Sequence, residues 1–357
     1  MYRSPTVGNV ELSEALTRAM VEHFGLNEVS LTPIRSGPLS IAWECRGIRG
    51  SEPVRWCVKG HRTRKTQVID LESEFTRVWQ SLVGKLIPKT VPCDDGPLWF
   101  AVGDRFFSAH EFIAADQPFN WTCCTWSAGQ TRAAGQGLAT FHLGSESIRE
   151  ALGDGSLAFA GSVMPKVRNV FAKTLAGVTD DHRRADPLLD SIPEPTLLRR
   201  LDKLLLALDA ENSVLYLVHG DYHPGNLLFR ADELVAILDL EDVHYEDLLF
   251  DVGYGALSFA GKWGRLENPT ASQEFSEEFL DSELMSAFLE GYNELAFKSA
   301  VGASGHPVTK KTIEKHVQLA GFLVLQWLLE MYLKEPDARS GLSSPLKDCL
   351  KYLLTCK

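Results

Sequence analysis

The sequence predicts an α+β protein with two lobes, a small one rich in β-strands and a larger one made mainly of helices. Short segments rich in β-branched and aromatic residues crowd into the first third of the chain. Helical periodicity dominates after residue 114. With 357 residues, of which 45% are hydrophobic, the chain is long enough to form two cores. We therefore expect a first lobe over residues 1–113 and a second lobe over residues 114–357.

The small lobe is expected to be a mostly antiparallel sheet with helices at about 11–24 and 67–84. In the second helix, apolar residues recur at helical spacing and predict one buried stripe: Leu71, Phe75, Val78 and Leu82. Glycine, proline and serine separate the strand segments. The strands are expected at 29–34, 41–47, 54–60, 97–102 and 105–113.

The large lobe is expected to be helical, with one short hairpin of strands at 226–229 and 234–240. Its predicted helices lie at about 124–142, 164–176, 195–210, 247–260, 275–297 and 308–334. A cleft between two lobes is a common place for a small-molecule site. We therefore look for functional residues that both lobes could bring to such a cleft.

The composition narrows the class of partner. The formal net charge is −11, which disfavours nucleic acid and anionic membranes, since both require a basic surface. Seven cysteines, an odd number without any C-x-x-C pair, argue against a disulfide framework or a cysteine-based zinc site. The N-terminus has no apolar signal-peptide core, and no apolar stretch is long enough to span a membrane. We expect a cytoplasmic protein, either a monomer or a homodimer.

The segment "LVHGDYHPGNLLF" (217–229) contains the polar residues that suggest chemistry. Asp221 precedes Asn226 by five positions, and Asp239 follows Asn226 by thirteen, at the end of the predicted hairpin. Lys59 ends the third predicted strand, and acidic residues lie on the helix after it. Taken together and in this order, these residues match what phosphoryl transfer from ATP requires.

Each residue type suits one part of that reaction. A carboxylate such as Asp221 can orient a substrate hydroxyl and take its proton. Magnesium, a hard cation, prefers oxygen ligands such as the amide of Asn226 and the carboxylate of Asp239. A lysine on a rigid strand can neutralise the α- and β-phosphates if an acidic partner holds it.

The segments "HGDYHPGN" and "ILDLEDVHYEDLLFDVG" resemble the catalytic loop and the metal-binding segment of the aminoglycoside phosphotransferase and choline-kinase-like superfamily. These are small-molecule kinases with a bilobal, protein-kinase-like fold. The resemblance is sharp over residues 217–255, and the second segment is most similar to the choline-kinase and methylthioribose-kinase branches. Gly220 stands where protein kinases carry arginine.

The resemblance implies roles for the reacting residues. Asp221 would be the catalytic base, and Asn226 and Asp239 would bind Mg²⁺. Lys59 would contact the phosphates of ATP. Glu74 would hold that lysine, because the family's helix carries a glutamate at a comparable place, with Glu72 as the alternative.

Further roles follow from the same resemblance. Glu241 would reach a second magnesium, and Asp251 would brace the catalytic loop by accepting backbone N–H groups. His219 is expected to pack beneath the loop and bond its backbone. The connector "HEFIAA" would offer the backbone of Glu111 and Ile113 to adenine.

The phosphate loop is expected at "SGPLS" (36–40), between the first two strands. It holds a single glycine, Gly37, followed by a proline that has no N–H to donate. Such a loop can still offer N–H groups from Leu39 and Ser40. This departure from the family pattern leaves room for an unusual phosphate donor, and ATP is not distinguished from GTP.

The acceptor is expected to be a hydroxyl of a small molecule, and an amine-bearing molecule is one candidate. Acidic residues cluster after Asp239, and Asp242 and Glu246 among them suggest an amino alcohol or an amino sugar. His223 is either a loop-ordering histidine or a contact to the acceptor. A sugar or a hydroxy amino acid also fits the pattern.

Two other functions compete with a kinase. A metal-dependent phosphoesterase would use the many metal-capable side chains between His219 and His244. It would also need an earlier D-x-H strand end and an Asn-His-Asp segment, both of which are missing, and it leaves Lys59 unexplained. A non-catalytic or weakly active nucleotide-binding homologue is favoured by the unusual phosphate loop, although the base and both magnesium ligands are intact.

Overall fold

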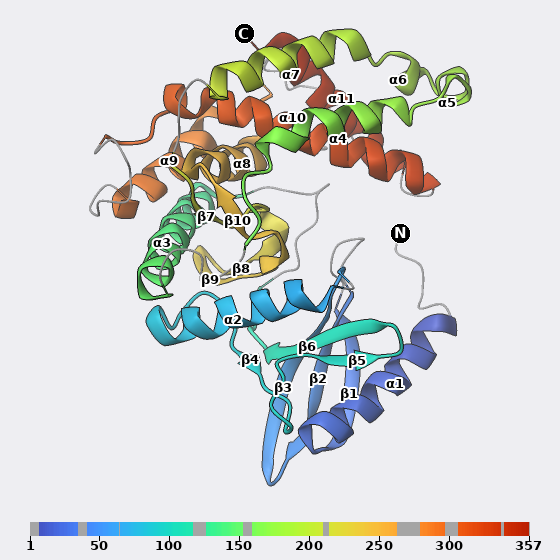
Figure 1. The fold of residues 1–357 in the computed structure, drawn as a ribbon, viewed down its shortest axis with the longest axis vertical. Helices are drawn as coiled ribbons and strands as arrows, with labels where there is room; N and C mark the ends of the chain where they lie inside the picture. Colours follow the sequence, from blue (N-terminus) through green and yellow to red (C-terminus); the bar gives the residue numbers. More distant parts are fainter. Residues whose placement is uncertain are drawn as a thin grey trace.

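The protein, seen in a computed structural model, has two lobes that lie one above the other along its long axis (Figure 1). The structure describes residues 7–34, 41–63, 65–116, 126–152, 159–209, 214–262, 279–296, 306–336 and 339–356. The expected phosphate loop at 36–40, with Gly37 and Ser40, lies outside these residues.

The small lobe is built on an antiparallel sheet with the strand order β1-β2-β3-β6-β4, and β5 pairs with β6. The five segments predicted as strands all contain strands, so the expected antiparallel sheet is confirmed. The two-residue strand β4 was missed because it is too short for an alternating pattern. The strands are β1 (Leu26–Ile34), β2 (Ile41–Arg49), β3 (Glu52–Gly60), β4 (Thr90–Val91), β5 (Phe100–Val102) and β6 (Arg105–Glu111).

Helix α1 (Val7–Phe24) covers one face of this sheet (Figure 1). Leu16, Met20 and Phe24, spaced by four residues, are fully buried in the small-lobe core. The ring of Phe24 meets Trp56 of β3 edge-on, with 5.4 Å between ring centroids. The sheet therefore has a core of its own, which holds the strands that carry Lys59.

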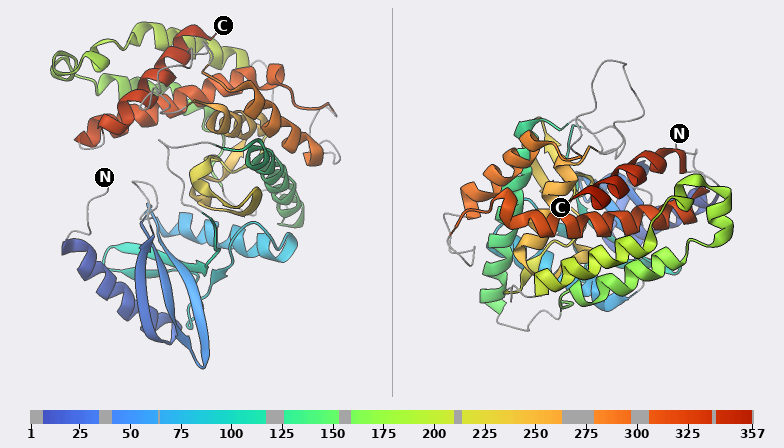
Figure 2. Two further views of the ribbon diagram at one scale, coloured as in Figure 1. Left: turned by 180° about the vertical axis from the view of Figure 1, so that it is seen from behind. Right: turned by 90° about the horizontal axis from the view of Figure 1, so that it is seen from above.

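Helix α2 (Thr66–Leu82) packs against the large lobe, although its position in the sequence falls within the range 1–113 expected for the small lobe. It lies between the sheet and the large lobe in both side views (Figures 1 and 2). The ring of Trp79 stacks on Phe141 of α3 (Ala128–Leu152), with 5.3 Å between centroids. The predicted buried stripe is wrong at Leu82, which is 48% exposed because it lies in the last turn, beyond this contact.

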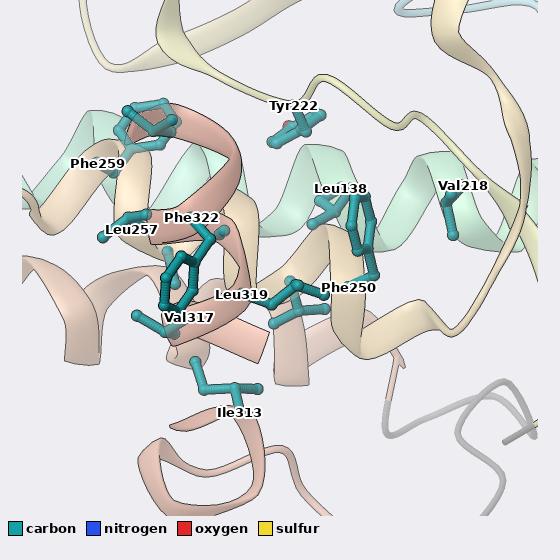
Figure 3. Packing of buried hydrophobic residues seen from close by; sticks show 14 of the residues in the cluster. Leu138, Val218, Tyr222, Phe250, Leu257, Phe259, Ile313, Val317, Leu319 and Phe322 are labelled. Carbon is teal, nitrogen blue, oxygen red and sulfur yellow. The ribbon is translucent and has the colours of Figure 1, made fainter. Parts of the chain in front are cut away.

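The large lobe is a bundle of helices, and its core is centred on α8 and α10 (Figure 3). The expected helical character is confirmed, while α5, α6 and α11 were not predicted. None of the described helices is long and apolar enough to cross a membrane. After α3, the helices are α4 (Met164–Ala176), α5 (Asp180–Ala185), α6 (Pro187–Asp190), α7 (Glu194–Asp209), α8 (Leu248–Ala260), α9 (Ser282–Ala296), α10 (Lys310–Lys334) and α11 (Arg339–Thr355).

Two small antiparallel ladders lie in the large lobe on the side that faces the sheet (Figure 1). The predicted hairpin is confirmed as β8 (Leu227–Arg230) paired with β9 (Glu233–Ile237). Strand β7 (Tyr216–Val218) pairs with β10 (His244–Glu246), and each has only three residues. The segment "HGDYHPGN" thus runs from the end of one ladder to the start of the other.

Replacing Trp79 with alanine should strongly destabilise the protein, because the stacked contact between α2 and α3 would become a cavity. We expect Trp79→Ala to lower the free energy of unfolding by about 3–5 kcal/mol in urea denaturation. Leu82→Ala, on the same helix but exposed, should change it by less than about 0.5 kcal/mol. Equal losses in the two variants would contradict the packing of α2 described here.

Candidate active site

The segment "HGDYHPGN" (219–226), called here the catalytic-loop segment, is held by the buried carboxylate of Asp251 on α8. Asp251 accepts the backbone N–H groups of His219 at 2.5 Å and Gly220 at 2.9 Å, the arrangement expected from the sequence. Burial alone would raise the pKa of Asp251, but the hydrogen bond and charge of His142, the charge of His219 and the backbone N–H of Gly220 outweigh burial and lower this pKa. His219 is buried, and its Nε2 lies 3.0 Å from the carbonyl oxygen of Leu238.

Gly220 is required by its backbone conformation. Its φ of +82° lies in the region that side chains disfavour. A Cβ atom there would lie 2.3 Å from the carbonyl oxygen of Asp242. This crowding explains why the position where protein kinases carry arginine is a glycine in this chain.

Asp221, the expected base, is held by three side chains. Its Oδ1 accepts a hydrogen bond from the hydroxyl of Tyr254 at 3.0 Å. Its Oδ2 accepts one from Asn226 Nδ2 at 3.1 Å and lies 3.4 Å from His223 Nε2. Burial would raise the pKa of Asp221, but the charge and hydrogen bond of His223 and the hydroxyl of Tyr254 lower it well below its usual range. The carboxylate therefore stays ionised at neutral pH.

His223 orders the loop, which is one of the two roles expected for it from the sequence. Its Nδ1 accepts the backbone N–H of Gly225 at 2.9 Å, which caps the short helical turn η1 (Pro224–Asn226). The other ring nitrogen faces Asp221. A contact to an acceptor remains a prediction for this residue.

The two expected magnesium ligands are linked through the backbone. The N–H of Leu238 donates to the carbonyl oxygen of Asn226 at 2.8 Å, which places Asp239 beside the loop. Asp239 has a φ of +60°, a strained conformation for a residue with a side chain, and such strain gathers at functional sites. The Nδ2 group of Asn226 donates to Asp221, and no described residue donates to its Oδ1. That amide oxygen is therefore free to meet a cation.

The partner of Lys59 is Glu72, so the expectation that Glu74 would hold this lysine is wrong in this structure. Lys59 Nζ lies 3.0 Å from Glu72 Oε1, whereas Glu74 bonds to Arg77 and is 40% exposed. Residues two apart on a helix point about 200° apart, so only one of the two glutamates can face β3. Glu72 shares the buried side of α2.

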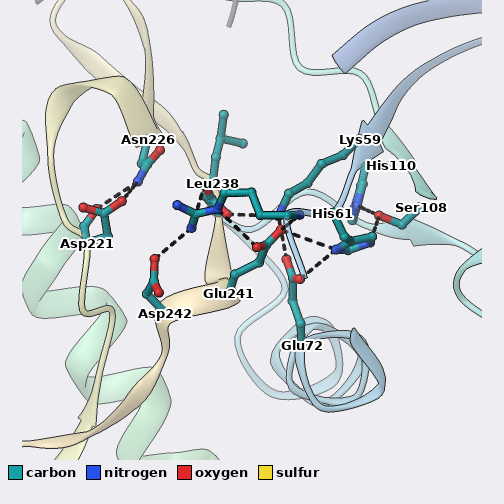
Figure 4. A network of polar contacts seen from close by, with 12 residues as sticks. Lys59, His61, Glu72, Ser108, His110, Asp221, Asn226, Leu238, Glu241 and Asp242 are labelled. Atoms are coloured by element: carbon teal, nitrogen blue, oxygen red, sulfur yellow. Dashed lines mark hydrogen bonds and ion pairs between the residues drawn. The ribbon is translucent and has the colours of Figure 1, made fainter. Parts of the chain in front are cut away.

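Lys59 joins the two lobes electrostatically (Figure 4). Besides Glu72, its Nζ lies 3.1 Å from Asp239 Oδ1 and 3.3 Å from Glu241 Oε1. Burial alone would lower the pKa of Lys59, but the three carboxylates outweigh it and raise it. For the acidic Glu241 the effects have the opposite sign. Burial alone would raise its pKa, but hydrogen bonding to His61 and the charge of Lys59 lower the pKa to about 2.

Arg62 is a second cation at this site, and no sequence motif pointed to it. Its guanidinium lies 2.8 Å from Asp242 Oδ2, 3.3 Å from Glu241 Oε2 and 3.7 Å from Asp239 Oδ2. Arg62 follows β3, while the three carboxylates lie in or beside the turn η2 (Leu240–Asp242) of the large lobe. The acidic cluster is thus neutralised from the small lobe by two basic side chains.

A chain of polar groups lies behind Lys59, and it too was missed (Figure 4). His61 Nδ1 lies 3.4 Å from Glu72 Oε2, and its Nε2 lies 3.0 Å from Ser108 Oγ. Ser108 Oγ in turn lies 2.7 Å from His110 Nε2. Burial, followed by the charge of Lys59, lowers the pKa of His110 to about 4, so this ring is neutral at physiological pH. The chain links the lysine–glutamate pair to the strand that ends in the connector.

The connector offers fewer groups to adenine than expected. The N–H of Glu111 donates to the carbonyl oxygen of Lys89 at 2.8 Å, and that of Phe112 lies 3.4 Å from the carbonyl oxygen of Arg55. Glu111 can therefore offer only its carbonyl oxygen to a base. The roles of Glu111 and Ile113 in binding adenine remain predictions.

Glu246, expected from the sequence to contact the substrate, bonds within the large lobe in this structure. It is 3% exposed, and its Oε2 accepts hydrogen bonds from Ser162 Oγ at 2.7 Å and from the backbone N–H of Val163 at 3.0 Å. It therefore fixes the segment that leads into α4. Asp242, by contrast, has a side chain that is 50% exposed beside Asp221, and burial followed by the charge of Asp221 raises its pKa against the opposing charge of Arg62.

The chemistry of the expected ligands suits a magnesium ion. Asn226 Oδ1 and the carboxylates of Asp239 and Glu241 are the hard oxygen ligands that this ion prefers. The two carboxylates also lie beside Lys59, the residue that would contact phosphates.

The sequence matches the family model described as "Phosphotransferase enzyme family" over residues 55–295, about two thirds of the chain. The chain belongs to this phosphotransferase family. The matched region includes Lys59, Asp221, Asn226 and Asp239, so the predicted relationship to small-molecule phosphotransferases is confirmed. No curated protein matches the chain.

Solved structures with the same fold include several small-molecule kinases. Spectinomycin phosphotransferase, in a complex with ADP and spectinomycin, is 16% identical with a TM-score of 0.63, over 96% of this chain and 98% of that one. A microcompartment-associated aminopropanol kinase is 16% identical with a TM-score of 0.65, over 96% and 98%. Choline kinase from Cryptosporidium parvum is 12% identical with a TM-score of 0.65, over 96% and 94%. The expected bilobal kinase-like fold of this phosphotransferase is thereby confirmed.

Replacing Gly220 with alanine should disrupt the loop, because the added methyl group would collide with the backbone of Asp242. We expect Gly220→Ala to cost more than about 3 kcal/mol of unfolding free energy in urea denaturation. Gly50→Ala is the matched control, since Gly50 also has a positive φ, of +63°, but its Cβ would meet nothing within 4 Å. It should cost only about 1 kcal/mol. Similar costs at the two positions would refute the collision.

Proposed function

We propose that the protein is a small-molecule kinase that transfers the γ-phosphoryl group of ATP to a hydroxyl of its acceptor. The observation that supports this function most is the convergence of Lys59, Asp221, Asn226 and Asp239 on one site between the lobes. A metal-dependent phosphoesterase has no use for a lysine paired with a glutamate on a separate lobe, and it does not fit the family.

Asp221 would act on the acceptor. Its carboxylate accepts the hydrogen bond of the acceptor hydroxyl and takes the proton as the hydroxyl oxygen bonds to the γ-phosphorus. The bond between that phosphorus and the oxygen bridging to the β-phosphate breaks, and ADP leaves with the bonding electrons. Since the pKa of Asp221 is strongly lowered, it is a weak base that receives the proton late. Its main contribution is to orient the attacking oxygen, as a loose phosphoryl-transfer transition state requires.

The remaining residues would hold the phosphates. Lys59, fixed by Glu72, would neutralise the α- and β-phosphates. A magnesium ion held by Asn226 and Asp239, with Glu241 as a further ligand, would supply positive charge to the β- and γ-phosphate oxygens. Lys59 and Arg62 exchange carboxylate partners for phosphates as the nucleotide enters.

The acceptor is proposed to carry an amine near its hydroxyl. Asp242 pairs with Arg62 in this structure, and once Arg62 turns to the phosphates, the half-exposed carboxylate of Asp242 would give the acceptor side of the site a negative charge next to Asp221. Structural relatives named for spectinomycin, aminopropanol and choline point the same way. A panel of aminoglycosides, spectinomycin, 1-amino-2-propanol, choline, ethanolamine, homoserine and sugars, each with ATP and with GTP, would identify acceptor and donor by release of ADP or GDP. Nucleotide binding without transfer to any of them would favour an inactive homologue.

Asp221→Asn should abolish most turnover and leave nucleotide binding intact. The amide keeps the size of the side chain but cannot take a proton, so we expect kcat to fall by about 10²–10⁴-fold. Calorimetric titration with Mg-ADP should show an affinity within a few-fold of the wild type. Near-normal turnover by this variant would overturn the proposed role of Asp221.

Glu72→Gln should impair the enzyme far more than Glu74→Gln. Loss of the Glu72 charge frees Lys59 to move, so we expect kcat/KM for ATP to fall by about 10–100-fold. Glu74 pairs only with Arg77 at the surface, so Glu74→Gln should stay within about two-fold of the wild type. Steady-state kinetics on both variants would decide between the two glutamates, and the reverse order would reject the pairing.

A further inference from the structure

The hydroxyl of Tyr254 contacts the side chain that reacts. It donates to Asp221 Oδ1 at 3.0 Å, and it comes from α8, outside the catalytic-loop segment. Tyr254 lies three positions after Asp251, and residues three apart on a helix lie on the same side. Helix α8 therefore holds the loop at two points. Asp251 binds the loop backbone, and Tyr254 binds the carboxylate of Asp221 in the loop.

Tyr254 is built to remain a donor in a fixed place. Its ring stacks on that of Phe250, one turn earlier, with 6.5 Å between centroids and 19° between the ring planes. Burial and the charge of Asp221 raise the pKa of Tyr254 well above its usual value. The phenol thus keeps its proton throughout the physiological range.

The two oxygens of Asp221 are held from different elements. Oδ2 is held by the loop itself, through Asn226 and His223, while Oδ1 is held by Tyr254. Among the side chains that the structure describes, only the phenol hydroxyl of Tyr254 donates to Oδ1. Without that hydroxyl the carboxylate can turn about its own axis, and the acceptor hydroxyl loses a defined direction of approach.

We propose that Tyr254 is a positioning residue for phosphoryl transfer, which fixes the Asp221 carboxylate in the orientation that receives the acceptor hydroxyl. This inference rests on the proposed function of Asp221. Tyr254 does not exchange a proton during the reaction, since the acceptor proton goes to Asp221. Its contribution is geometric, so its loss lowers the rate of the bound complex and leaves nucleotide affinity unchanged.

Tyr254→Phe removes only the hydroxyl and tests the proposal directly. With the most active acceptor of the panel, and with water as the acceptor in slow ATP hydrolysis, kcat should fall about 10–100-fold. KM for ATP should change less than about three-fold. The matched control is Tyr332→Phe, because the hydroxyl of Tyr332 also bonds an aspartate, Asp186, at 2.7 Å, but in a remote part of the large lobe. This control should retain wild-type kinetics, and an unchanged kcat in Tyr254→Phe would overturn the proposal.

A double-mutant cycle separates this inference from the proposed function. If Tyr254 acts through Asp221, Tyr254→Phe should have no further effect on kcat in the Asp221→Asn background. Full turnover by Asp221→Asn alone would reject the function of the base, whereas slow Asp221→Asn with fast Tyr254→Phe would reject only the inference. Crystal structures of both single tyrosine variants give a readout without turnover. The Asp221 carboxylate should lose its fixed orientation in Tyr254→Phe alone, and an unmoved carboxylate there would also overturn the proposal.

Discussion

The buried carboxylate of Asp251 is the interaction on which the site depends. A charge taken out of water is costly unless hydrogen bonds compensate it, and Asp251 has partners on three sides. It accepts two N–H groups of the catalytic loop, and His142 Nε2 of α3 lies 3.2 Å away. His142 in turn contacts Tyr292 of α9 at 2.9 Å. Three helices of the large lobe thus converge on the backbone that carries Asp221, so the packing of the bundle sets the geometry of the loop.

The part of the site that comes from the small lobe is held by ion pairs. Lys59 and Arg62, three residues apart, meet four carboxylates, of which Glu72 comes from α2 and the others from the segment after β9. Lys59 lies at the end of a strand with its own core, and Glu72 lies on a helix that belongs to the other core. The pair can therefore form only when both cores are folded and correctly placed. This cluster of charges therefore depends on the folding of both cores.

The sequence alone was sufficient wherever the signal is local. The spacing of Asp221, Asn226 and Asp239 predicted a linked set of ligands, and the structure ties them together through Leu238. The short strands β4, β7 and β10 carried no recognisable strand pattern and were missed, whereas β5, also three residues long, lies within the predicted segment 97–102. The sequence could not show which of Glu72 and Glu74 pairs with Lys59, because this depends on which side of α2 faces β3. Tyr254, His61 and Arg62 belong to no motif, and the bonds of Glu246 to the segment before α4 could not be inferred from the sequence.

Helix α2 also changes what can be treated as a unit of this protein. Among the described residues, the chain passes from the small-lobe core to the large-lobe core before α2, returns after it, and crosses again after β6. Three separate crossings mean that neither lobe is a continuous piece of sequence. A cut near residue 113 would separate Trp79 from Phe141, the ring it stacks on. Any movement of one core relative to the other would therefore have to change the backbone at all three crossings and not at one.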